Sequence, residues 1–141
     1  SNTFNTSVDP TNTYGADSSN INVDVTGNSN VFTLNQANAA QASNLDLDWI
    51  INGSSNSITA AIDIDLATNY VDFDGSDNTL TYDGDGASNG FFHLEHDGSD
   101  RTFSIEQQST LNNDWLKIIS SGTGTSTVCV VQSDGGTSTS C

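Results

Sequence analysis

The chain has 141 residues, of which 33% are hydrophobic, so it suits one domain but supplies little apolar material for a wide core. Eighteen acidic residues against two basic ones, Arg101 and Lys117, give a formal net charge of −16. This charge repels phosphates and anionic lipids, which disfavours nucleic acid and anionic membranes as partners. The sequence has no run of about 18 apolar residues, so it predicts no membrane insertion.

Residues 1–20 form a polar arm of mostly Asn, Ser and Thr that also holds the only proline, Pro10. Such a composition is typical of a disordered leader. The alternative is an assembly arm, in which Phe4, Val8 and Tyr14 dock on a neighbouring subunit by strand addition. Both interpretations stay open at this stage.

Residues 21–36 read as a strand, a tight turn and a second strand. Apolar side chains alternate at Ile21, Val23 and Val25, and the alternation resumes at Phe32 and Leu34 after a turn that begins with a glycine. A period of two indicates strands with one buried and one solvated face.

The same unit recurs at intervals of 22 to 26 residues. The turn glycines are Gly27, Gly53, Gly75, Gly98 and Gly122, and the residues three positions later are Asn30, Asn56, Asn78, Arg101 and Thr125. The first three turns are therefore G-x-x-N. Glycine supplies positive φ and Asn tolerates the left-handed region, so we expect both residue types to serve a tight reversal.

The flanks of each turn keep one register. Four residues before the glycines stand Val23, Trp49, Val71, Leu94 and Ile118; two and four residues after the Asn-equivalent positions stand Phe32, Ile58, Leu80, Phe103 and Thr127, then Leu34, Ala60, Tyr82, Ile105 and Cys129. We predict that these positions face inward and that stacked units cover one another. The fold expected for residues 21–132 is an all-β solenoid of about five coils; the alternative is an antiparallel β-sandwich or meander.

The two cysteines, Cys129 and Cys141, both lie near the end of the chain, and the chain begins without Met. This pattern is typical of a mature secreted chain with one disulfide. A sequence that begins inside a longer chain would also lack the initial Met. We expect the disulfide to fold residues 133–141 over the last coil as a cap. A disulfide between subunits is the alternative.

Several acidic residues resemble calcium ligands. Asp72, Asp74 and Asp77 in D-F-D-G-S-D, followed by Asp83 and Asp85 in D-G-D-G, place oxygen ligands at alternate positions beside a glycine. The complete twelve-residue loop of an EF-hand is absent, so solvated turn acids are the competing interpretation. Calcium is thus the only cofactor the sequence suggests.

Other chemistry has little support. His93 and His96 lie three apart on a strand and should face opposite sides, which makes a joint metal site poor. No G-x-S-x-G motif occurs, so we expect no enzyme. Outward Thr residues in the last unit, including Thr123 and Thr125, alternate as in ice-binding solenoids. Ice binding requires such an array in every coil, and we take the outward positions elsewhere to be Asp and Asn.

The repeated pattern of strand, G-x-x-N, strand and Gln resembles the curlin repeat of bacterial amyloid-like surface fibres. Gln36 and Gln107 lie six residues after Asn30 and Arg101, where curlin repeats place their second glutamine, whereas Gln132 is one residue out of this register. The resemblance covers roughly residues 21–132. Apolar residues replace the first curlin glutamine in several units, which predicts a drier, more aliphatic interior.

The resemblance implies a secreted structural subunit that self-assembles into an extracellular filament, with copies of itself as partners. A biofilm matrix, an attachment fibre or a coat would fit this expectation. An adhesin or viral fibre domain that binds a glycan or a cell surface is the alternative.

Overall fold

The computed structural model describes residues 2–8, 20–36, 44–63, 67–86, 90–109 and 114–134. Within these ranges the chain contains eleven β-strands and no helix. The strands are β1 (Thr3–Val8), β2 (Asn20–Thr26), β3 (Val31–Gln36), β4 (Asp46–Asn52), β5 (Ser57–Asp63), β6 (Thr68–Asp74), β7 (Thr79–Gly86), β8 (Phe91–Asp97), β9 (Arg101–Ser109), β10 (Trp115–Ser121) and β11 (Ser126–Asp134).

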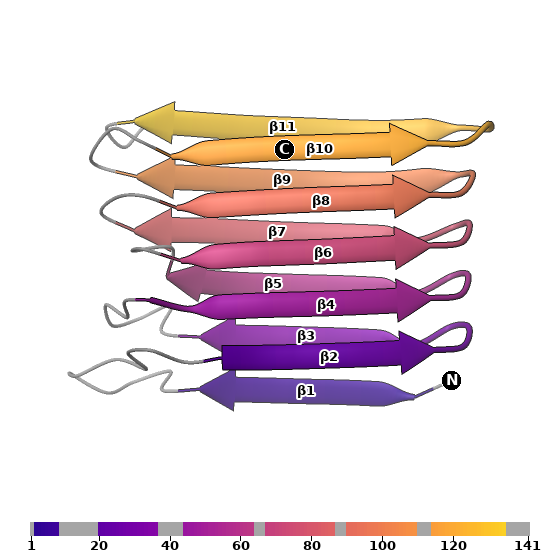
Figure 1. The fold of residues 1–141 in the computed structure, drawn as a ribbon, viewed down its shortest axis with the longest axis horizontal. Helices are drawn as coiled ribbons and strands as arrows, with labels where there is room; N and C mark the ends of the chain where they lie inside the picture. The colour runs from indigo at the N-terminus through magenta and orange to yellow at the C-terminus, as the bar shows by residue number, and fades with distance from the viewer. Residues whose placement is uncertain are drawn as a thin grey trace.

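The strands form two parallel sheets that face each other. Sheet A has the order β1-β3-β5-β7-β9-β11, and sheet B has the order β10-β8-β6-β4-β2. Consecutive strands alternate between the sheets, and the chain climbs steadily from β1 to β11 (Figure 1). All pairings are parallel, so the fold is a β-solenoid of five strand-turn-strand units, and the antiparallel alternative is wrong.

The core lies between the two sheets. It consists of columns of inward apolar side chains, and each column contains the equivalent residue of every strand in one sheet. One column on sheet B runs through Val23, Trp49, Val71, Leu94 and Ile118. Its middle members are at most 2% exposed. Alternation along each strand, combined with identical register between strands, therefore produces a continuous thin core without any wide cluster.

The first residues of the chain belong to this solenoid. Strand β1 pairs in parallel with β3 of the same chain, which places Phe4 on Phe32 with ring centroids 6.3 Å apart. Residues 3–8 thus add a strand to their own sheet A. Whether the arm also contacts a neighbour stays a prediction.

Each of the first four turns has glycine in an extended positive-φ conformation and a left-handed residue two positions later. The left-handed residues are Ser29, Ser55, Asp77 and Asp100. The expectation that Asn occupies the left-handed position is therefore wrong. The left-handed residue precedes the Asn, which has already entered the next strand and points inward.

The turn asparagines form a buried ladder. The backbone N–H of Asn30 donates to Oδ1 of Asn56 (3.0 Å), the N–H of Asn56 donates to Oδ1 of Asn78 (3.0 Å), and Asn2 donates to Oδ1 of Asn30 (3.1 Å). All three turn asparagines are at most 3% exposed. Each amide thereby satisfies a backbone donor of the neighbouring coil that would otherwise be buried without a partner.

Close contact explains why glycine recurs at the turn. A Cβ atom would lie 2.1 Å from the carbonyl oxygen of Gly27 if added to Gly53, and 2.3 Å from that of Gly53 if added to Gly75. At Gly98 and Gly122 the corresponding distances are 2.0 and 1.9 Å. A Cβ on Gly27 meets only Asn30 Nδ2, at 3.7 Å. The steric requirement for glycine therefore begins at Gly53, in the turn of the second coil.

The last turn is one residue longer than the others, which changes the register of β11. Phe103 pairs with Val128 and Ser104 pairs with Cys129. The expectation that Thr127 and Cys129 face inward is therefore wrong, because the extra residue moves both to outward positions. The same shift brings Gln132 into line with Gln107.

We expect Gly75→Ala to lower the free energy of unfolding by about 3 kcal/mol, because it adds a backbone clash to the strain of a positive φ. Gly27→Ala is the matched control, since it carries the strain alone and should cost about 1 kcal/mol. Urea denaturation followed by circular dichroism measures both. Equal losses would contradict the contact-based account of the repeat.

Asn56→Ala should cost about 2 kcal/mol, because the buried backbone N–H of Asn30 loses its acceptor. Asn22→Ala, on the exposed side of β2, should change stability by less than about 0.5 kcal/mol. The same denaturation assay compares the two. If Asn56→Ala lowers the free energy of unfolding no more than Asn22→Ala does, the asparagine ladder contributes nothing to stability.

Candidate functional site

Both ends of the solenoid expose side chains from the inward columns. Val128 is 47% exposed and Val130 is 41% exposed, although Phe103 and Ile105, directly beneath them, are at most 1% exposed. At the opposite end Phe4 is 52% exposed. The core therefore continues to both ends of the described chain without an apolar cover.

The backbone edges at these ends are also open within the described residues. Strand β1 has a neighbour only at β3, and β11 only at β9. Strand β1 contains no charged residue or proline, and the only charged residue of β11 is its last, Asp134. Proteins that block sheet edges use charges, prolines or covering segments, so these edges suit further strand pairing.

Aromatic rings on the outer face of sheet B stack along the solenoid axis. Phe91 and Trp115 come from the paired strands β8 and β10, and their rings are 4.1 Å apart with an interplanar angle of 2°. Trp115 is 42% exposed because only one of its faces is covered in this way. The rings thus stand upright from the sheet and do not form a flat platform.

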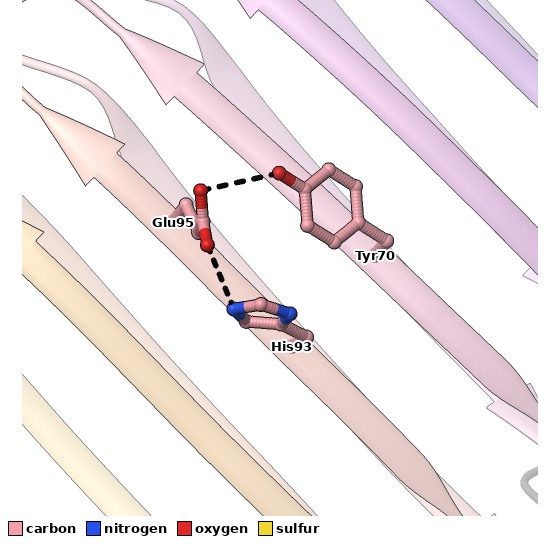
Figure 2. A network of polar contacts seen from close by, with 3 residues as sticks. All are labelled: Tyr70, His93 and Glu95. Carbon is pink, nitrogen blue, oxygen red and sulfur yellow. Dashed lines mark hydrogen bonds and ion pairs between the residues drawn. The ribbon is translucent and has the colours of Figure 1, made fainter.

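Figure 2 shows a polar network around Glu95 on the same face, in which the His93 ring lies 6.2 Å from the ring of Trp115. Tyr70 donates a hydrogen bond to Glu95 Oε2 (3.3 Å), and His93 Nε2 lies 3.1 Å from Glu95 Oε1. Burial, together with the charges of Asp72 and Glu95, raises the pKa of Tyr70 to about 12. Burial and the neighbouring acids Asp74, Glu95 and Asp48 also raise the pKa of Asp72. This face of the solenoid is consequently a negatively charged side wall.

The five calcium candidates do not converge. Asp72 and Asp74 lie on the outer face of sheet B, Asp77 is in the turn, and Asp83 and Asp85 lie on the outer face of sheet A. Among the described residues, no group of three or more His, Cys, Asp or Glu side chains could hold a metal ion. The described carboxylates therefore do not form one site around these five residues.

The two histidines face opposite sides, as the strand period predicts. His93 points outward, whereas His96 is 3% exposed between the sheets. His96 Nε2 lies 3.2 Å from the carbonyl of Gly75 and its Nδ1 lies 3.1 Å from Ser120 Oγ. Because a carbonyl only accepts, Nε2 carries the proton and Nδ1 accepts from the Ser120 hydroxyl.

Arg101 interrupts the asparagine ladder beside a shallow hollow of about 230 Å³ at the turn edge of sheet A. Its Nη1 donates to the carbonyl of Gly98 (3.3 Å), and Asp100 Oδ1 accepts from the backbone of Thr125. Arg101 thus stabilises its own turn, whereas Asp100 joins this turn to the next coil.

The remaining predicted residues divide into described and undescribed ones. Cys129 is disulfide-bonded, and Cys141 lies outside the described residues, as does Tyr14. Val8 belongs to β1, but its side chain is not described. The sequence of a single strand does not show that Phe4 and Val128 are exposed at open ends. Their exposure depends on where the stack of coils ends.

Comparison with known proteins gives no match to a family model, to a curated protein or to a solved structure. The resemblance to curlin repeats therefore stays a prediction. The part of the chain that the structure describes contains no helix long and apolar enough to cross a membrane.

Burial, with the nearby Arg101 guanidinium, lowers the pKa of His96. The unfolded chain then takes up this proton more readily, so His96 should reduce stability as pH falls below the ordinary histidine pKa of 6.5. We expect a lower melting temperature at about pH 5.5 than at about pH 8, and a smaller difference in His96→Gln.

His93→Gln is the control, because it removes an outward histidine and leaves His96 in place. Thermal melts followed by circular dichroism measure all three chains. Raised pKa values at Asp72 and Asp83 act in the opposite direction at lower pH, so the comparison must stop above the carboxylate range. A pH dependence that survives unchanged in His96→Gln would contradict the assignment.

Proposed function

We propose that this chain is a structural, non-catalytic subunit that assembles end to end into an extracellular filament. The observation that carries the proposal is the exposure of inward apolar side chains at both ends, at Phe4 and at Val128 and Val130. A solenoid whose core and backbone edges stop abruptly buries both when another copy stacks on it.

The registers of the two ends are compatible. One inward column of sheet A contains Phe4, Phe32 and, at its far end, Phe103 and Val128. If β11 pairs with β1 of the next copy in the same register, Phe4 of that copy takes the next place in the column and covers Val128. The backbone edges then pair at the ordinary strand spacing of about 4.8 Å.

Sheet B adds a constraint at this joint. Sheet A has six strands and sheet B has five, so joining β11 to β1 leaves one strand position open between β10 and β2 of the next copy. The free face of Trp115 borders this position. The joint is therefore complete only when a further segment occupies the position.

The charge of the chain sets the conditions for assembly. Each copy carries a formal charge of −16, and stacking brings the acidic side walls of successive copies into line. Salt screens this repulsion over about 10 Å at 0.1 M, and divalent cations bridge carboxylates. We therefore expect filaments to form more readily at higher ionic strength.

The resemblance to curlin repeats and the parallel, in-register strands support an extracellular, amyloid-like fibre. The alternative, a glycan-binding adhesin, has less support. Its best candidate platform, Phe91 and Trp115, uses ring faces for stacking on each other. Flat presentation of those faces to a sugar would require the stack to open.

The test is negative-stain electron microscopy across salt concentrations. Wild-type chain should form filaments, and Val128→Lys should abolish them because it places a charge in the joint. Added in small amounts to wild type, Val128→Lys should also shorten filaments, since its β1 end can still join a growing tip.

Val31→Lys is the matched control. Val31 is 40% exposed, similar to Val128, but it faces outward from β3. This variant should assemble as the wild type does. Monodisperse wild-type particles under all conditions would overturn the proposal. Equal effects of Val128→Lys and Val31→Lys on filament formation would show that the open end at β11 is not the surface that joins the copies.

A further inference from the structure

The outer face of sheet A carries an ordered set of hydroxyl groups. We define the hydroxyl array as the outward side chains at two positions on each of the middle strands β5, β7 and β9. Its members are Ser57, Thr59, Thr79, Thr81, Thr102 and Ser104. The sequence-based expectation that outward positions outside the last unit are Asp and Asn is wrong at these six positions, although Asp83 and Asp85 occupy outward positions farther along β7.

The array is a regular two-dimensional lattice. Ser57 pairs with Thr79 and Thr79 with Thr102, while Thr59 pairs with Thr81 and Thr81 with Ser104. Parallel pairing spaces each row by about 4.8 Å, and alternate residues on a strand lie about 6.6 Å apart. The same rows continue onto β3 as Val31 and Thr33. Water oxygens on exposed planes of ice repeat at similar distances.

The hydroxyls of the array are available to an external partner. Among the described residues none of the six takes part in a side-chain hydrogen bond, and Thr59, Thr81 and Thr102 are exposed. Four of the six are threonines, whose branched side chains have restricted χ1 angles. Their hydroxyls and methyls are thus held in place before any partner binds, which lowers the entropy cost of binding.

The array is uncharged in a chain that carries 18 acidic residues. No Asp, Glu, Lys or Arg stands in its two rows on any of the six strands of sheet A. Acids stand outside these two rows on both faces: Asp83 and Glu106 follow in the next row of sheet A, and Asp48, Asp72 and Glu95 lie on the outer face of sheet B. The uncharged rows therefore occupy one part of the outer face of sheet A, beside a part that carries acids.

The composition of the array narrows the class of partner. It has no aromatic or Arg anchor of the kind that dominates protein interfaces, and no basic group for nucleic acid. An uncharged, rigid lattice of hydroxyls and methyls complements an uncharged, regular surface of hydrogen-bonding groups. We propose that the hydroxyl array binds the surface of ice crystals.

This proposal is independent of filament formation, because the array lies within one copy. Slow freezing of a solution of the labelled full chain measures the fraction incorporated into ice. Wild type should enter the ice, whereas an unrelated acidic protein stays in the liquid. Thr81→Tyr should reduce incorporation by about tenfold or more, because a ring at the centre of the array holds the two surfaces apart.

Thr68→Tyr is the matched control, since Thr68 is an exposed, outward threonine on β6 of sheet B. It should enter ice as the wild type does, and circular dichroism checks that both variants fold. Exclusion of the wild type from ice overturns the proposal whatever the variants do. Equal incorporation of the two folded variants into ice overturns it as well. Binding of the wild type to crystalline cellulose without binding to ice also overturns it.

Discussion

The structure depends on the direct stacking of one turn glycine on the carbonyl of the one before it. At Gly75 and Gly98 no Cβ atom fits, because the backbone of the preceding turn occupies its place. Each coil therefore has to enter its turn as the previous coil did. This fixed entry keeps the strands in register, and register in turn aligns the inward columns, the asparagine ladder and the outward rows.

A fold built in this way does not limit its own length. The contacts that bury Ile105 between coils are the contacts that Val130 lacks at the last coil, so both ends keep unsatisfied surface. The two outer faces are free to differ, since neither takes part in the stacking. The outer face of sheet B became an acidic wall, whereas the outer face of sheet A combines the uncharged hydroxyl array with acids such as Asp83 and Glu106.

Much of the fold was predictable from the sequence because its determinants are local and repeated. The spacing of the glycines and the alternation around Val23 and Phe73 predicted strands, turns and stacking in the correct register for four units. The last unit was misread because one additional residue between Gly122 and Ser126 reverses which side chains of β11 face inward. The open ends were less predictable, because an exposed Val128 looks the same in sequence as a buried one.

The sequence by itself determined the period, the strands and the two-sided character of each strand, since these follow from short-range patterns of size and polarity. Tertiary structure decided the role of Asn30 and Asn56, whose amide oxygens accept from Asn2 and Asn30 of the neighbouring strand layer and not from their own turn. It also decided that β1 joins its own sheet and that the outward threonines of separate strands share one surface. These outcomes depend on distances between coils about 24 residues apart, and no pattern within a single unit contains that information.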